Sequence, residues 1–234
     1  MATESRSSGT QRRRAMCGGC GRPAVVCLCH VIPTPPISTT TKVVILQHPH
    51  ESRHPLNTAR ILSKSLINTT TVIARRLLPE HIQSNQSPPT PTYYLFPSTR
   101  SAPLSQLIDR IKSQMKTGPV VLIAFDATWN HAREMVKASE GYLNSFATGV
   151  CLEGFDPQSE GGSIYDSELF LRKEPCMGCV STAEAVSRWL DGVEDDGPEI
   201  KSQILGVLKE MVKLQAQFLK PIEPRPNVKN LRLK

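Results

Sequence analysis

Residues 120–138 read VVLIAFDATWNHAREMVKA, and this stretch decides the fold. The apolar run Val120–Phe125 predicts the most buried strand of the chain. Polar residues at Asp126–Trp129 end that strand, and a helix is expected from about Asn130 to Ala138. A continuously apolar strand that leads into a helix is typical of a parallel sheet covered on both faces.

Other segments continue this alternation of strands and helices. Further strands are expected at Lys42–Gln47, Thr70–Ala74 and Tyr93–Phe96. Helices are expected from Asn57 or Thr58 to about Ile67, from Ser101 to Met115, and at Thr182–Leu190 and Glu199–Phe218, with an acidic linker between the last two. The sequence therefore predicts an α/β fold with a parallel sheet and helices on both faces.

In such sheets, ligands bind beyond the carboxyl ends of the strands. The polar residues that follow strand ends are therefore the first candidates for a functional site. They are Gln47, His48, Pro97, Ser98 and Asp126–Trp129.

Four cysteines lie close together near the N-terminus, in the pattern Cys17-x2-Cys20-x6-Cys27-x-Cys29. Zinc takes four soft ligands in a tetrahedron, and two close pairs joined by a short loop supply them. Three glycines beside the first pair permit the tight turns of such a knuckle. We predict a zinc-binding segment at 15–41, with free thiols as the alternative and His30 as a possible substitute ligand.

The remaining cysteines give weaker signals. Cys176 and Cys179 offer two ligands rather than four, and thiols packed in a loop explain them as well. Cys151 is expected to be a buried apolar residue. The N-terminus lacks the apolar region of a secretory signal, so we expect a reducing location, cytoplasmic or nuclear. No apolar run is long enough to span a membrane, so no membrane partner is expected.

The formal net charge of +7 is unevenly distributed. Residues 1–14 carry four arginines against one glutamate, whereas 151–199 hold 12 acidic and 3 basic residues. We expect 1–14 to be a disordered basic tail, 42–220 the main domain and 221–234 a second basic tail. Basic tails fit a polyanionic partner such as nucleic acid, with solvated tails as the alternative.

The segment Asp126–Arg133 is one of several that together match a known pattern. The others, in chain order, are the cysteine-rich head, Leu46–Glu51, Pro55–Arg60, Phe96–Ser98, Leu171–Lys173 and Val180–Ala185. These segments resemble the DTW-domain family, which is named for its Asp-x-Thr-Trp motif. Its tRNA-modifying members are tRNA-uridine aminocarboxypropyltransferases, and the eukaryotic type that modifies the D-loop is the most similar. The resemblance covers roughly residues 15–220.

The resemblance implies a SPOUT-like sheet with a C-terminal trefoil knot, and S-adenosylmethionine held by the knotted loops. It implies transfer of the 3-amino-3-carboxypropyl group to N3 of a tRNA uridine, with release of methylthioadenosine. Two other functions compete with this one. They are a SPOUT-type RNA methyltransferase that uses the same cofactor, and a zinc-containing RNA-binding protein without catalysis.

The resemblance also implies roles for the matching residues. Uridine N3 carries a proton and becomes a good nucleophile only when a base removes or shares that proton. Asp126 is the candidate base, and capping of the following helix is its alternative role. Thr128 either hydrogen-bonds the cofactor or caps the helix. Trp129 stacks on the target base, walls the cofactor pocket or lies in the core.

Two further groups of residues are expected to contact ligands. The cofactor contacts are Phe96, Pro97, Ser98, Phe125, Leu171, Arg172, Ser181 and Thr182. The RNA contacts are Gln47, His48, Arg60, Arg133 and Lys173. His48 is also an alternative base. Arg133 can pair with an RNA phosphate or with the cofactor carboxylate, and a plain surface charge is the alternative.

Overall fold

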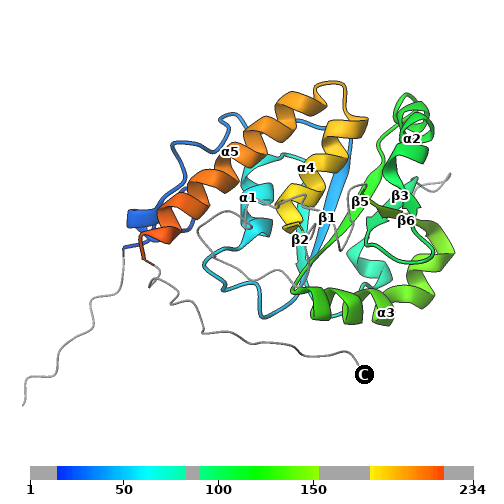
Figure 1. The fold of residues 1–234 in the computed structure, drawn as a ribbon, viewed down its shortest axis with the longest axis horizontal. Helices are drawn as coiled ribbons and strands as arrows, with labels where there is room; N and C mark the ends of the chain where they lie inside the picture. Colours follow the sequence, from blue (N-terminus) through cyan, green and yellow to red (C-terminus); the bar gives the residue numbers. More distant parts are fainter. Residues whose placement is uncertain (1–14, 83–89, 153–179, 219–234) are drawn as a thin grey trace, which may run out of the picture.

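The computed structural model describes residues 15–82, 90–152 and 180–218 (Figure 1). Within them, six strands form one sheet with the order β2-β1-β5-β3-β6-β4, and every neighbouring pair is parallel. The strands are β1 Lys42–Gln47, β2 Thr69–Ile73, β3 Thr92–Leu95, β4 Ala102–Pro103, β5 Val121–Asp126 and β6 Ala147–Cys151. The predicted parallel α/β sheet is confirmed.

Helices cover both faces of this sheet. They are α1 Thr58–Ser65, α2 Ile108–Met115, α3 Trp129–Phe146, α4 Thr182–Val193 and α5 Gly197–Ala216, with short 3-10 turns at Ala24–Val26, Pro79–His81 and Leu104–Gln106. Helices α1, α2, α4 and α5 share one hydrophobic core, and α3 packs on the opposite face of the sheet (Figure 1). None of the described helices is long and apolar enough to cross a membrane.

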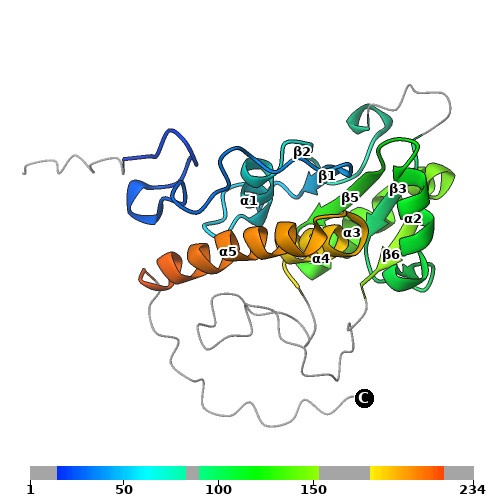
Figure 2. The ribbon, with the colours of Figure 1, turned by 90° about the horizontal axis from the view of Figure 1, so that it is seen from above.

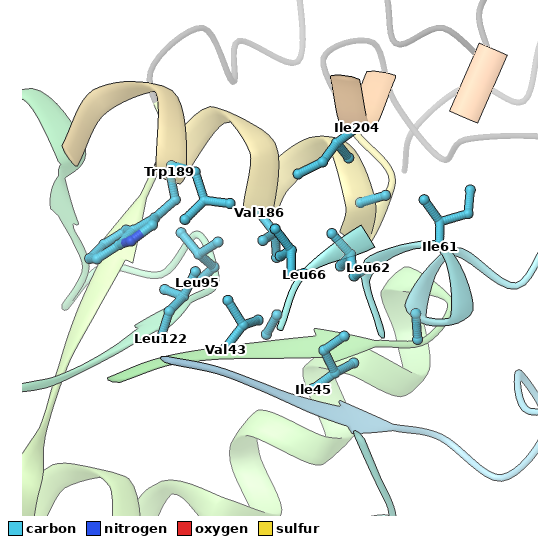
Figure 3. Packing of buried hydrophobic residues seen from close by; sticks show 14 of the residues in the cluster. Val43, Ile45, Ile61, Leu62, Leu66, Leu95, Leu122, Val186, Trp189 and Ile204 are labelled. Carbon is cyan, nitrogen blue, oxygen red and sulfur yellow. The ribbon is translucent and has the colours of Figure 1, made fainter. Parts of the chain in front are cut away.

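The alternation of side chains along the strands divides the core into two layers. Val43 and Leu122 face α4, where Trp189 is fully buried among them (Figure 3). Val44 and Ile123 face α3. Each fully buried large apolar side chain stabilises the fold by about 1.5–3 kcal/mol relative to an exposed one. These two layers hold the strand ends, and the polar residues that follow them, in fixed positions.

The segment after β3 differs from the prediction. A helix was expected from Ser101, but Ala102 and Pro103 pair with β6 as a short edge strand, and α2 begins only at Ile108. Pro103 has no N–H to donate, and an edge strand is the place in a sheet where a proline is tolerated.

Helix α3 and the strand after it also differ from the prediction. The helix continues past Ala138 to Phe146, because Ser139 and Leu143 extend its buried stripe. Strand β6 was not predicted, because it is short and contains Gly149. A Cβ at Gly149 would lie 2.8 Å from the Tyr94 hydroxyl, so the neighbouring strand requires this weak strand former. Cys151, at the end of β6, is half-buried rather than buried.

The cysteine-rich segment is attached to the main domain through Arg22, which is only 5% exposed. Its guanidinium donates to the carbonyls of Val26 and Pro55, both at 2.9 Å, and to the Gln215 side chain at 3.4 Å. Figure 2 shows this segment beside the end of α5. The first and the last described parts of the chain are therefore in contact.

Several predictions fall on residues outside the described ranges. They concern the tails, the knot loop, Leu171, Arg172, Lys173, Cys176 and Cys179.

Candidate active site

Asp126 ends β5 with its carboxylate held from two sides. Gln47, its register partner on β1, donates from Nε2 to Oδ2 at 2.7 Å. Thr58, the first residue of α1, donates from Oγ1 to Oδ1 at 3.1 Å. The side chain is 5% exposed, and each oxygen keeps capacity for a further hydrogen bond. The carboxylate is therefore oriented, with acceptor capacity left for a substrate N–H.

Asn57 connects this carboxylate to the loop after β1. Its Oδ1 accepts from Gln47 Nε2 at 3.1 Å and caps α1 by accepting from the Arg60 backbone N–H at 3.0 Å. Its Nδ2 donates to the carbonyls of Glu51 and Ser52. Sequence reasoning named Asn57 and Thr58 only as alternative caps of the helix and gave neither a role in the site. The available signal was the position of both residues in the matched segment Pro55–Arg60.

The structure at the start of α3 distinguishes among the alternative roles that the sequence left open for Asp126, Thr128 and Trp129. Thr128 caps the helix, since its Oγ1 accepts from the His131 backbone N–H at 3.4 Å. Asp126 therefore does not serve as the cap. Trp129 is half-buried rather than enclosed in the core, and its ring lies 6.2 Å from the Phe96 ring between centroids. The two aromatic rings form a wall next to the end of β5.

Three imidazoles pack beside the same strand end. The backbone N–H of His48 donates to the Asp126 carbonyl at 2.9 Å. The His48 ring lies parallel to that of His131, with centroids 4.2 Å apart, and His50 completes the group. Burial, followed by the charges that His131 and His50 can carry, lowers the pKa of His48 below 6.5. Since an ion cannot lie in the planes of two parallel rings at once, this arrangement is a packed cluster rather than a chelating one.

The four cysteines of the head lie within reach of one ion. Neighbouring sulfurs are 3.4 Å apart for Cys17 and Cys27, 3.5 Å for Cys17 and Cys29, and 3.7 Å for Cys20 and Cys27. Zinc–sulfur bonds of about 2.3 Å in a tetrahedron place sulfurs about 3.8 Å apart. The donor set therefore fits zinc.

The backbone conformation of the cysteine-rich head explains why the four sulfurs lie so close together. Gly21 has a φ of +66°, which a glycine adopts without strain. A Cβ at Gly19 would lie 2.8 Å from the Cys29 sulfur. Hydrogen bonds from the backbone N–H of Cys20 and then from the Cys27 thiol lower the pKa of Cys17 to about 6, whereas the hydrogen bond with Cys17 raises the pKa of Cys29 to about 12, so Cys17 is the thiol that favours the thiolate before a metal binds.

The remaining predicted residues occupy several places. Ser181 caps α4 by accepting from the Glu184 N–H at 3.3 Å, and Thr182 follows it, half-buried. Phe125 is buried on the α3 face. Arg60 donates to the Gly21 carbonyl at 3.0 Å, so one function of this predicted RNA contact is to hold the head.

Phe96, Ser98 and Arg133 line one pocket between β3 and α3. Pro97 is half-buried between the first two. The structure therefore groups Gln47, His48 and Asp126 at one strand edge, and Phe96, Ser98 and Arg133 beside it.

The DTW domain profile matches residues 14–216, nearly all of the described chain. The chain belongs to the DTW-domain family. It is similar to tRNA-uridine aminocarboxypropyltransferase A of Arabidopsis thaliana, with 51% identity over 229 residues, covering 92% of this chain and 86% of the relative. It is also similar to tRNA-uridine aminocarboxypropyltransferase 2 of Drosophila melanogaster, with 29% identity over 89% of this chain and 78% of the relative. The Mus musculus enzyme of that name is 28% identical over 88% of this chain and 65% of its own length. No solved structure matches this chain significantly.

Proposed function

We propose that this DTW-family protein transfers the 3-amino-3-carboxypropyl group of S-adenosylmethionine to N3 of a uridine in tRNA, in the D-loop. The observation that carries the proposal is the Asp126 carboxylate, which is buried and oriented at the carboxyl edge of the sheet. A tRNA-uridine aminocarboxypropyltransferase matches this chain along most of its length. Methylthioadenosine is the other product.

Asp126 is the base in this reaction. Its carboxylate accepts the proton of N3–H, while Gln47 and Thr58 hold its two oxygens in place. S-adenosylmethionine supplies a carbon activated by the adjacent sulfonium, and the carbon that reacts is the one held in line with the nucleophile. The N3–carbon bond forms as the carbon–sulfur bond breaks, and that bond's electron pair stays on the sulfur of methylthioadenosine.

The other predicted residues keep their proposed places around this base. Phe96, Pro97, Ser98, Phe125, Leu171, Arg172, Ser181 and Thr182 contact the cofactor, within a SPOUT-like sheet that ends in a trefoil knot. Gln47, His48, Arg60, Arg133 and Lys173 contact RNA. Trp129 stacks on the target uridine beside Phe96, which the ring distance of 6.2 Å supports. We place the enzyme in the cytoplasm or nucleus.

The head holds one structural zinc ion through Cys17, Cys20, Cys27 and Cys29, a proposal supported by the sulfur distances. The ion staples a segment whose own buried side chains are few, and Arg22 then fixes that segment to the main domain.

Mass spectrometry of tRNA nucleosides tests the function. Wild-type protein incubated with tRNA and S-adenosylmethionine should add the aminocarboxypropyl mass to uridine and release methylthioadenosine. Asp126→Asn should abolish the product while tRNA binding is kept, and Asp109→Asn, an exposed carboxylate on α2, should react as wild type does. Release of adenosylhomocysteine would show methyl transfer instead, and full activity of Asp126→Asn would refute the assigned base.

A further inference from the structure

A pocket of about 190 Å³ opens on the α3 face of the sheet, outside the Asp126 network. One wall is a face of α3 that carries Arg133, Lys137 and Glu140, spaced four and three residues apart. The other wall is the end of β3 with the loop that follows it, including Phe96 and Arg100. Residues four apart on a helix lie on the same side, so Arg133 and Lys137 face the same space.

The charges in this pocket do not cancel. Arg100 Nη1 lies 2.6 Å from Glu140 Oε1, so these two neutralise each other. Within the described residues, Arg133 and Lys137 make no ion pair, and both are exposed. The pocket therefore presents two unneutralised positive charges on adjacent turns of one helix, which is the arrangement that binds an anion.

The size and the charge favour a phosphate over the cofactor. Pockets that enclose a small organic ligand usually measure about 300–1,000 Å³, so this one is too small to enclose S-adenosylmethionine. That cofactor also carries a sulfonium and an ammonium against one carboxylate, and two cations would repel it. A phosphodiester group is small and negative, and the rest of its chain can lie outside the pocket.

The wall of the pocket adds an aromatic surface next to the reactive strand end. Phe96 is half-buried, and its ring lies 6.2 Å from that of Trp129, three residues beyond Asp126. Bases of single-stranded nucleic acid stack on exposed aromatic rings, while arginine and lysine bind the adjoining phosphates. The pocket thus offers both base stacking and phosphate binding close to Asp126, the general base that acts on the target uridine.

We propose that this pocket binds one phosphate of the tRNA backbone next to the target uridine, held by Arg133 and Lys137, while the adjoining base lies at the mouth of the pocket against Phe96. The inference rests on the proposed function for the identity of the RNA. It adds Lys137 as a substrate-binding residue, assigns Arg133 to a phosphate rather than to the cofactor carboxylate, and assigns the exposed side of Phe96 to RNA rather than to the cofactor.

The salt dependence of tRNA binding tests this assignment. The affinity of Arg133→Ala, Lys137→Ala and the double variant for tRNA is measured at several salt concentrations without cofactor, and S-adenosylmethionine affinity is measured separately. Removal of one cation that binds a phosphate should flatten the slope of log affinity against log salt by about 0.7–0.9. The double variant should lose roughly tenfold or more in affinity at low salt, with cofactor affinity unchanged.

Two further variants make the test specific. Lys112→Ala removes an exposed lysine from α2, on the other face of the sheet, and should leave the slope unchanged. Phe96→Leu should weaken tRNA binding without changing the slope, because it removes stacking but no charge. Thermal melts show whether each variant is folded.

The outcomes separate this inference from the function itself. A double variant with the wild-type slope and affinity, or one that loses cofactor affinity instead, would overturn the phosphate assignment even if uridine is modified normally. A flattened slope in a protein that transfers no aminocarboxypropyl group would support the phosphate site while the proposed function fails.

Discussion

Thr58 has a small side chain, but its hydroxyl helps to orient the Asp126 carboxylate. Its hydroxyl is the donor to Oδ1 from a helix rather than from the neighbouring strand, and the residue is 3% exposed. Gln47 holds the other oxygen from within the sheet. The carboxylate is thus fixed by two elements, and loss of either donor lets it rotate.

Replacing Thr58 by Val tests this with little change of volume. We expect kcat to fall by roughly tenfold, equal to about 1.4 kcal/mol, while KM for tRNA stays unchanged, because the hydroxyl orients the base and touches no substrate. The missing buried hydrogen bond should also cost about 1 kcal/mol of stability. Thr58→Ser keeps the hydroxyl and should restore kcat. A rise in KM alone would contradict the positioning role.

His48 makes the fold sensitive to acid. It is buried, and its pKa lies below 6.5, with His131, His50 and Arg75 adding to the effect of burial and Glu51 opposing it. The unfolded chain therefore binds the proton more readily than the native protein, and stability falls as the pH drops below about 6.5.

His48→Gln should reduce this loss on the acid side, since glutamine has no proton to gain. Melting temperatures between pH 7.5 and pH 5 measure the effect, with the exposed His54→Gln as the control. Equal pH dependence in wild type and His48→Gln would contradict the prediction.

The sequence predicted single residues better than their partners. Asp126 and the four cysteines are found from local patterns, namely a polar residue after an apolar run and the spacing of thiols. Thr58 meets Asp126 across 68 positions of sequence. That contact depends on the pairing of β1 with β5 and on the packing of α1, which no local pattern specifies.

At the scale of elements, α3 depends on the cap at Thr128. Replacement by Ala removes the acceptor for the His131 N–H and should destabilise the protein by about 1 kcal/mol. Thr128→Ser should restore most of that stability. Denaturant unfolding measures the difference. If Thr128→Ala leaves stability unchanged but weakens cofactor binding, Thr128 acts through the cofactor rather than as a cap.

The strands that the sequence predicted have a continuous run of strand-forming residues, whether buried as in β1 or largely exposed as in β2. Strand β1 has the predicted bounds, because five of its six residues are buried. Strands β4 and β6 were missed, because one contains Pro103 and the other Gly149, and both residues are weak strand formers. Their place in the sheet comes from pairing between segments distant in sequence, since β6 pairs with β3 and β4 pairs with β6.

At the scale of the whole molecule, the proposed zinc ion should stabilise the main domain as well as the cysteine-rich head. Cys20→Ser should lower the bound zinc from one equivalent per protein to a small fraction of that amount. It should also lower the melting temperature, because Arg22 connects the folded head to the loop at Pro55 and to Gln215. Elemental analysis and thermal melts measure both effects. Cys151→Ser, outside the cluster, is the control. Full zinc content in Cys20→Ser would contradict the site.

The uneven charge leads to a prediction about RNA affinity. Residues 1–14 carry four arginines against one glutamate, so their removal should weaken tRNA binding more at low salt than at high salt. Binding measurements at two salt concentrations test this, with uridine modification at saturating tRNA as the control for an intact site. Unchanged affinity at low salt would contradict a role for the tail in RNA binding.

The contact between Arg22 and Gln215 has a consequence for synthesis of the protein on the ribosome. The two residues are 193 positions apart. At about 5–20 residues per second, the head leaves the ribosome about 10–40 s before its partner helix exists. During that interval the cysteines lie in a nascent chain that cannot yet be docked. Zinc captured then would give the head its own structure early and would protect the thiols from oxidation until α5 arrives.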